Sequence, residues 1–285
     1  MIRLFPLQVR ALAGLVGVSV MTLAWQPVAL AESVAPGTQP PDPWAGTVEL
    51  YGFSPWVKAT TTVRGFEVDT ELTPIQVLNV LQFVANGRAS LEHQRLGVMV
   101  DAAYTRLGAE RSTSSPRGLV KGSAEVTSIN GVYDLALRYR FGARESATGQ
   151  PGRWWVIPYA GMRLVQAQLD VAARLQGQGP LGLRFERDRS LERTWTQPLV
   201  GTQASVFVTP GLRVFARGDL GGFGLAGDRD ISGNAQAGMG IALGNSTELL
   251  ASWRYLGLAW SNGADRSTGF STDQHGVELG LKLLF

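Results

Sequence analysis

From Thr47 to the C-terminus the sequence repeats one pattern: apolar and polar residues alternate for about ten or more positions, and a turn or polar loop follows. The clearest case is residues 125–141. One parity there holds Ile129, Gly131, Tyr133, Leu135, Leu137, Tyr139 and Phe141, and the other holds Asn130, Asp134, Arg138 and Arg140. Because successive side chains of a strand point to opposite faces, this alternation predicts a strand with one apolar and one polar face.

Ten such segments can be delimited. They are residues 47–57, 81–92, 96–107, 125–141, 154–171, 193–209, 212–221, 231–243, 247–260 and 275–285. Repeated alternating segments of this length predict an all-β fold, an antiparallel transmembrane β-barrel. An even strand number places both ends of the barrel on one side of the membrane, where short turns are expected.

The connections fit this arrangement with one exception. Those after even-numbered segments are short, such as 93–95, and those after odd-numbered segments are longer and polar. The exception is Gly142–Arg153, a long connection on the short-turn side. Eight or twelve strands also remain compatible with the pattern, because the parity of 47–57 is ambiguous and residues 57–68 could form a hairpin of their own. Residues 73–80 could form a short helix in the first outer loop.

The N-terminus predicts export. Residues 1–31 combine a basic start, an apolar run and the small residues Ala29 and Ala31, which is typical of a cleaved signal peptide. As a helix the run of about 14 apolar residues would rise only about 21 Å, too short to span a bilayer. Residues 32–45 are proline-rich and predict a periplasmic tail, so that the barrel domain comprises residues 46–285.

The C-terminus points to the outer membrane. Residues 275–285 alternate strictly and end on Phe285 with no polar tail, and we interpret Phe285 as an assembly signal for the barrel-assembly machinery. The other expected partners are outer-membrane lipid and lipopolysaccharide, whose phosphates the arginines of Arg184–Ser190 could contact. The oligomeric state stays open.

Composition narrows the function classes. Without the two arginines of the expected signal peptide, 24 basic residues face 23 acidic ones, so the precursor's pI of about 9.4 is weak evidence for a nucleic-acid partner, and export disfavours one further. Beyond the signal peptide no run of 18 apolar residues exists, which excludes transmembrane helices, and the chain has no cysteine. We expect no cofactor and no metal.

The barrel interior is expected to be charged. Ten strands about 4.8 Å apart and tilted by about 40° give a backbone radius of roughly 10 Å, which inward side chains would largely fill. The inward charged residues are Arg88, Glu92, Asp101, Asp134, Arg138, Arg140, Arg163, Arg213, Arg217, Asp219, Glu248, Arg254, Glu278 and Lys282.

Opposite charges in a narrow tube should pair, since an isolated buried charge is costly. We expect Arg138, Arg217 and Arg254 to neutralise Asp134, Asp219 and Glu278. This favours a structural scaffold of the envelope with a charge-filled lumen. The alternative is a narrow porin-like channel with a slight preference for small anions. The same charges disfavour an apolar lumen for lipid-like ligands.

An enzyme is the competing class. The chain has two histidines. His93 is expected in a periplasmic turn. His275 is expected at the outer rim near Ser271 and Asp273, so a hydrolase that uses His275 is a further alternative, although this spacing alone carries little information.

Several motifs are similar to one group of uncharacterised bacterial outer-membrane barrel proteins. They are Val48-Glu-Leu-Tyr-Gly-Phe-Ser-Pro-Trp56, Thr62-Val-Arg-Gly-Phe-Glu-Val68, Arg217-Gly-Asp-Leu-Gly-Gly-Phe-Gly224 and Trp253-Arg-Tyr-Leu256. The resemblance covers roughly residues 46–285 and implies a membrane barrel of the porin-like or OmpA-like kind. It implies no activity, so it assigns no functional residue. The chain departs from the usual pattern at Gly52–Phe53, where more apolar bulk is expected.

Overall fold

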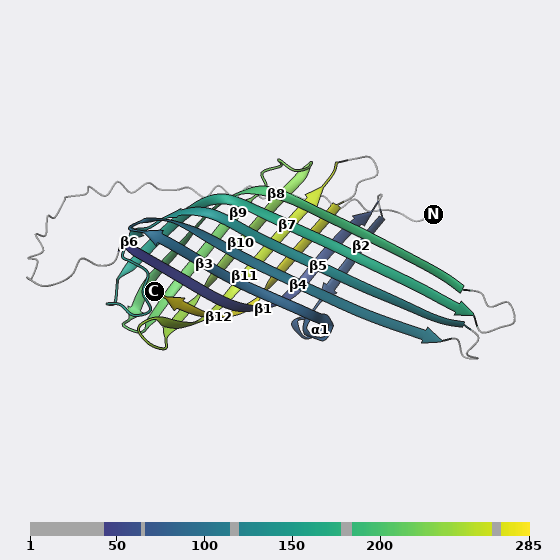
Figure 1. The fold of residues 1–285 in the computed structure, drawn as a ribbon, viewed down its shortest axis with the longest axis horizontal. Helices are drawn as coiled ribbons and strands as arrows, with labels where there is room; N and C mark the ends of the chain where they lie inside the picture. Colours follow the sequence, from purple (N-terminus) through teal and green to yellow (C-terminus); the bar gives the residue numbers. More distant parts are fainter. Residues whose placement is uncertain (1–42, 64–65, 115–119, 178–183, 264–268) are drawn as a thin grey trace, which may run out of the picture. The chain divides into compact units, whose positions relative to one another are not determined.

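The structure is a computed structural model that describes residues 43–63, 66–114, 120–177, 184–263 and 269–285. The expected signal peptide and nearly all of the expected tail lie outside these residues. The described chain forms twelve strands and one helix (Figure 1). They are β1 Trp44–Val63, β2 Phe66–Leu72, α1 Pro74–Val80, β3 Leu81–His93, β4 Leu96–Ser114, β5 Val120–Tyr139, β6 Phe141–Gly142, β7 Trp154–Gly177, β8 Arg184–Thr209, β9 Leu212–Gly221, β10 Arg229–Ala242, β11 Thr247–Ser261 and β12 Gly269–Leu284. No helix in the described ranges is long and apolar enough to cross a membrane.

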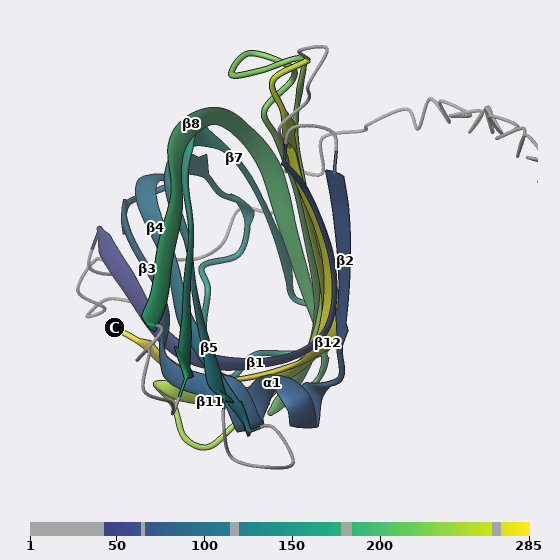
Figure 2. The same cartoon turned by 90° about the vertical axis from the view of Figure 1, so that its right-hand side faces the viewer.

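Ten of the strands close into a barrel, which confirms the predicted fold. Around the wall the order is β1, β3, β4, β5, β7, β8, β9, β10, β11 and β12, and every neighbour is antiparallel. The pairing of β12 with β1, from Thr47↔Leu284 to Thr62↔Gly269, closes the ring that Figure 2 views end-on. The strands β2 and β6 are short additions that pair with β1 and β7.

Several strand boundaries differ from the expected ones. β1 begins at Trp44 and continues to Val63, where the chain returns as β2, so a hairpin extends the first strand. The last strand begins at Gly269 instead of His275, and the fourth expected strand is interrupted at Arg140, between β5 and β6. The additional residues at the outer ends of β1 and β12 lie outside the apolar belt, where both faces meet water and the sequence need not alternate.

Burial separates the two faces of each wall strand. In β5 the side chains of Asp134 and Arg138 are buried, whereas Leu135 is 56% exposed on the outward face. The outward apolar residues of β5 and β6 run from Ile129 to Phe141, a rise of roughly 30 Å along a tilted strand, which matches the hydrocarbon core of a bilayer. The other wall strands carry equivalent outward residues, among them Val98, Val100, Met162, Val200, Val214, Met239, Leu249 and Leu279. The barrel thus presents an apolar belt to lipid and polar groups to its interior.

Four neighbouring strands extend the wall beyond the membrane. The pairing of β7 with β8 continues to Gln176↔Arg184, and that of β5 with β7 continues to Val120↔Gly177. Figure 1 shows β4, β5, β7 and β8 running past the rest of the barrel at the end opposite the C-terminus. The short turns and the C-terminus mark the periplasmic end, so this extension lies outside the cell.

The helix α1 connects β2 to β3, as residues 73–80 suggested. Thr73 caps its first turn: the Gln76 N–H donates to the Thr73 hydroxyl at 3.4 Å, and the Thr73 N–H donates to Gln76 Oε1 at 2.9 Å. Pro74 fits the first helical turn, where a backbone N–H has no helical partner. Thr73 and Pro74 therefore start a helix directly after β2.

Candidate functional site

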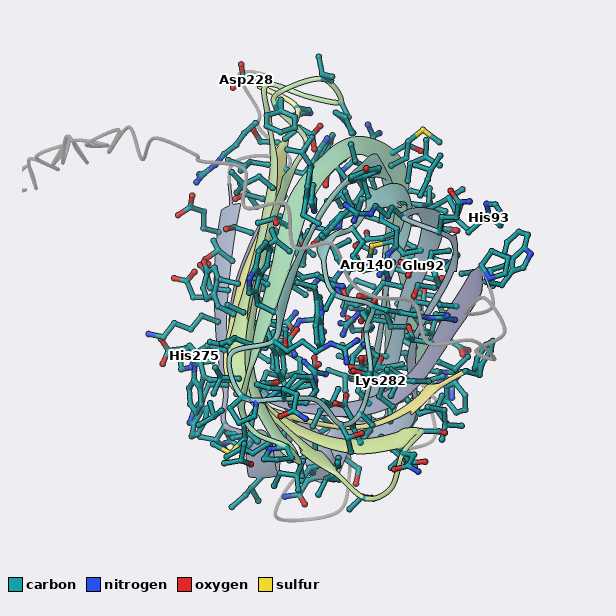
Figure 3. The ribbon with its side chains drawn as sticks, turned by 90° about the vertical axis from the view of Figure 1, so that its left-hand side faces the viewer. Glu92, His93, Arg140, Asp228, His275 and Lys282 are labelled. Carbon is teal, nitrogen blue, oxygen red and sulfur yellow. The ribbon has the colours of Figure 1, made fainter. Side chains whose placement is uncertain are left out.

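The inner end of the lumen holds a cluster of alternating charges. Arg140 Nε donates to Glu92 Oε1 at 2.8 Å, and Arg138 Nη2 donates to Glu92 Oε2 at 3.4 Å. Lys282 lies in the same cluster, and Figure 3 shows Glu92, Arg140 and Lys282 together at the interior of the barrel. All of these side chains are buried, so each charge depends on its neighbours for the interactions that water would otherwise supply.

Glu145 enters this cluster from the loop between β6 and β7. Its carboxylate, whose side chain is 5% exposed, accepts hydrogen bonds from Lys282 Nζ at 2.8 Å and from Arg138. Burial acts to raise the pKa of Glu145, but the two cations outweigh it and hold that pKa well below its ordinary range. The loop starts at Gly142, whose φ of +82° favours glycine and where a Cβ would lie 2.6 Å from the Trp154 carbonyl oxygen. The long connection on the short-turn side therefore places an acid inside the periplasmic mouth.

Replacing Glu145 with glutamine is expected to flatten the pH dependence of stability at acid pH. Because folding lowers the pKa of Glu145, its ion pairs stabilise the barrel fully above the ordinary glutamate pKa of about 4.3, and this contribution is lost as the pH falls below that value. Urea unfolding from about pH 7 to about pH 3 should show the two proteins converging at low pH. The matched control is Glu186→Gln, which removes a more exposed carboxylate. A difference that is independent of pH would contradict the ion-pair assignment.

A second network crosses the middle of the lumen. Arg88 on β3 bonds to Glu49 at 2.9 Å and to Asp101 on β4 at 2.8 Å. Asp101 also accepts from Arg217 Nη1 at 2.9 Å, although Arg217 lies on β9, four strands farther around the wall. Tyr51 Oη donates to the same carboxylate at 2.8 Å. The carboxylate of Asp101 on β4 thus links β1 and β3 on one side to β9 on the other.

Arg163 on β7 forms the third connection and is 1% exposed. Its guanidinium binds both carboxylate oxygens of Asp134 at 2.7 and 2.8 Å and donates to Asp219 Oδ1 at 2.7 Å. It also donates to Ser232 Oγ at 3.0 Å. Planar, two-pronged hydrogen bonding of this kind is specific to arginine, so lysine could not replace Arg163 without loss.

The other expected lumen charges are also paired. Arg213 binds Glu248 in a two-pronged contact at 2.7 and 2.8 Å, and Arg254 donates to Glu278 at 2.8 Å. Of the three expected pairs, Arg254 with Glu278 is present. Arg217 binds Asp101 more closely than Asp219, from which it is 3.8 Å away.

Arg138 does not contact Asp134, contrary to expectation; its partners are Glu92 and Glu145, and Asp134 binds Arg163. Alternation shows on which face of its strand a residue lies. It does not show the level of that residue along the barrel axis relative to residues on other strands, because that level depends on the strand register in the closed barrel.

Sequence reasoning missed Glu49, Tyr51 and Glu145, as well as Ser232, which accepts from Arg163. Glu49 and Tyr51 lie on β1, whose parity was ambiguous, and pairing with β12 settles it because Glu49 lies opposite Lys282. Glu145 lies in a loop with no alternation to read. The only available indication of its role was the unusual length of its connection.

The networks leave little room in the lumen. The cavity among Glu49, Arg88, Arg213 and Arg217 has a volume of about 30 Å³, far below the roughly 300 Å³ or more of a typical ligand pocket. A larger cavity of about 250 Å³ lies at the periplasmic mouth beside Glu145. Among the described side chains, no group of three or more His, Cys, Asp or Glu residues is arranged to hold a metal ion.

Apolar clusters also line the interior. Val165, Trp195, Leu258 and Trp260 form a buried cluster, against which Val132 packs. Asp230 lies at its lower edge, where it accepts from Trp195 Nε1 at 3.2 Å and from the amide of Gln197. The interior thus combines charged networks with buried apolar clusters, which the expectation of a charged lumen did not include.

The two histidines lie outside the lumen. His93 ends β3 and packs edge-on against Trp44 with ring centres 4.9 Å apart. The ring of His275 stacks with those of Trp56 and Trp253, at 5.6 and 5.8 Å, on the outward face of the wall (Figure 3). Asp273 binds the hydroxyl of Tyr255. The partners of His275 are thus aromatic rings in the position of a membrane-interface belt.

Comparisons with known proteins agree on the fold. No protein-family model and no curated protein matches the chain. A similar solved structure is the outer membrane protease OmpT from Escherichia coli, with a TM-score of 0.50 and 8% identity over 88% of this chain and 99% of that one. Two others are Neisserial surface protein A (TM-score 0.26, 12% identity, 84% and 96% covered) and Ail, the attachment invasion locus protein of Yersinia pestis (0.25, 13%, 85% and 98%).

At 8% identity the likeness to OmpT concerns the fold alone. It agrees with the closed antiparallel wall and with the outward apolar belt, which place the chain in an outer membrane. The chain is a transmembrane β-barrel of the outer-membrane type.

Proposed function

We propose that the protein is a structural, non-conducting barrel of the outer membrane, whose inner half is sealed by ion pairs. The observation that carries this proposal is the set of ion pairs inside the lumen that join strands not adjacent in the wall, Arg163 with Asp219 and Arg217 with Asp101. The first contact joins β7 to β9, and the second joins β9 to β4. A solute could pass only if several buried ion pairs separated together, which is costly.

The proposed partners of the barrel are lipid, lipopolysaccharide and the barrel-assembly machinery. Its belt binds outer-membrane lipid, and its outer extension reaches the level at which lipopolysaccharide phosphates meet arginine side chains. Phe285 completes the wall: the Gly46 N–H donates to the Phe285 carbonyl at 2.8 Å, and the Phe285 N–H donates to the Gly46 carbonyl at 3.0 Å. We propose that the barrel-assembly machinery recognises this last residue. We propose no enzymatic activity: among the described residues, the ring partners of His275 are Trp56 and Trp253.

Conductance in a planar lipid bilayer tests the proposal. The wild-type barrel is expected to be silent or to give only small, rare currents. Replacing Arg217 and Arg254 together with alanine should open a path, because both guanidiniums fill the central layer. The current should favour cations, since Asp101, Asp219 and Glu278 keep their negative charges.

The matched control replaces two exposed arginines, Arg106 and Arg174, with alanine and should stay silent. A heat-dependent shift in gel mobility would show that each variant is folded. Steady conductance by the wild type would overturn the proposal in favour of the narrow channel.

A further inference from the structure

The outer extension of the wall is a four-stranded sheet that ends at β8 on one side (Figure 1). The pairing of β8 with β7 continues as far as Gln176↔Arg184, but its pairing with β9 begins only at Leu199↔Gly221. Among the described residues, strand pairing therefore leaves Arg184–Gln197 with a neighbouring strand on one side only. We call this segment the β8 edge.

Alternate residues of the β8 edge turn their backbone groups away from β7. The Gly222 N–H donates to the Pro198 carbonyl at 3.1 Å, so Pro198 turns its carbonyl to the side opposite β7. This direction alternates along a strand, so the even-numbered residues before Pro198 turn their N–H and C=O groups to the same open side. The exposed members of this row are Glu186, Asp188, Ser190, Glu192, Thr194 and Thr196. Such a row is a template on which a further strand can add to a sheet.

The β8 edge lies beyond the lipid belt. On the outward face of β8 the last large apolar side chain is Val200, and the exposed residues that follow it toward the outside are the polar Thr196, Thr194 and Glu192. Water can therefore bind the open backbone groups, which lipid could not do. A partner that adds to this edge has to come from the aqueous phase outside the cell.

The outward face beside the β8 edge is acidic. Beyond the lipid belt, its described side chains on β5, β7 and β8 include five carboxylates and one cation. The cation is Arg174, whose Nε lies 2.8 Å from Glu186. The carboxylates are those of Glu125, Asp170, Glu186, Asp188 and Glu192. This part of the surface therefore carries a net negative charge.

Two of these carboxylates are available to a cation from outside. Among the described side chains, Asp188 and Glu192 form no ion pair. A cavity of about 440 Å³ lies on the same part of the sheet, lined by Glu125, Asp170 and Asp188. It has room for a long cationic side chain.

A second copy of the chain does not suit the β8 edge. Two such edges that paired antiparallel about a twofold axis would keep their outward faces on the same side of the joint sheet. A pairing centred on Ser190, for example, would place Asp188 of one copy opposite Glu192 of the other. Like charges in directly opposite positions are destabilising. The charges thus protect the edge from its own kind and favour a partner of the opposite sign.

We propose that the β8 edge binds an extended cationic segment of another polypeptide as an added strand. Backbone hydrogen bonds to the open row of β8 hold the segment. Its lysine or arginine side chains, at alternate positions, lie opposite Asp188 and Glu192, because side chains in directly opposite positions of neighbouring strands are only about 5 Å apart at their Cβ atoms. The site is outside the lumen, so it is independent of whether the barrel conducts.

Binding of a synthetic peptide to the folded full barrel in phosphatidylcholine vesicles tests the proposal. The probe is a fluorescent, end-blocked peptide of four Thr-Lys repeats, which as a strand has all its lysines on one face. Fluorescence anisotropy should show saturable binding, which Asp188→Asn with Glu192→Gln weakens about tenfold. The matched control, Asp228→Asn with Asp273→Asn, removes two exposed carboxylates away from the edge and should leave the affinity unchanged. No saturable binding by the wild type, or equal losses in the two variants, would overturn the proposal.

Two methylated peptides separate strand addition from simple attraction of charges. N-methylation of the lysines keeps every charge but removes the N–H groups that an antiparallel added strand turns toward β8, and it should weaken binding at least about tenfold. N-methylation of the threonines removes the N–H groups on the other side and should have little effect. The reverse order would indicate parallel addition at the same edge. Equal affinities of the two methylated peptides would refute strand addition.

Disulfide trapping locates the bound peptide. The chain has no cysteine, so Ser190→Cys can be oxidised with peptides that carry one cysteine at successive positions. Trapping should be efficient at every second peptide position, because successive side chains of a strand point to opposite faces. The matched control is Thr127→Cys, on the same face and at the same level but two strands in from the edge, and it should trap little. Trapping without this period, or equal trapping at Thr127, would show that the peptide does not add to β8.

Discussion

Replacing Arg163 with methionine is expected to destabilise the barrel by about 3–5 kcal/mol, the usual cost of removing one partner from a buried ion pair. Methionine has a similar length and leaves little empty space, so the loss comes from the charges that remain. Asp134 and Asp219 would both keep buried carboxylates without their guanidinium. The quantity to measure is the free energy of unfolding in urea, with the barrel in lipid vesicles.

Two variants separate this charge effect from packing. Neutralising the carboxylates as well, in the triple variant Asp134→Asn, Arg163→Met and Asp219→Asn, should restore much of the lost stability, because no uncompensated charge remains. Arg174→Met removes an exposed arginine that is paired with Glu186 at 2.8 Å, and it should change the free energy of unfolding far less than Arg163→Met does. If the triple variant were no more stable than Arg163→Met, the carboxylates would not be the cause.

Placing arginine at Leu135 is expected to cost roughly 2–4 kcal/mol, the range for a cation on the lipid face near the middle of a bilayer. Leu135 lies midway between Phe141 and Ile129 on the outward face of β5. The same unfolding measurement applies, with Thr127→Arg as the matched control on the same strand and face. Thr127 lies beyond the belt, beside Asp170, so arginine there should be nearly neutral. Equal costs at the two positions would mean that the membrane boundary on β5 has been misplaced.

The wall of the barrel could be predicted from sequence because lipid imposes a strict rule. Every outward residue between Phe141 and Ile129 has to be apolar or small, so the sequence alternates along this stretch. Such alternation indicates where a strand lies, which of its faces is outward and how many strands the barrel has. The rule ends at the membrane boundary. The outer parts of β7 and β8 have water on their outward face, which removes the constraint and hides their true length.

The interior could be predicted only in part. Alternation placed Arg163 and Asp219 on the inward face, but their contact depends on the stagger between β7 and β9 in the closed ring, which no local pattern encodes. Glu145 lies in a loop, where the chain has no period. The end of the pairing between β1 and β3 at Leu50↔Gly87 escaped prediction for a related reason: residues 81–86 alternate like any paired strand, and sequence does not show whether the neighbouring strand is close enough to pair.

The cross-lumen contacts also have a consequence for the order of assembly. Asp101 and Arg217 are 116 residues apart, and Arg163 and Asp219 are 56 apart, so neither contact can form while the strands between them are still being added. Hairpins such as β3–β4 can gain their hydrogen bonds early, but the interior charges have to wait until the ring is nearly complete. The stabilisation they give therefore arrives in the closing step. A barrel built this way should close cooperatively, and partly closed forms should be short-lived.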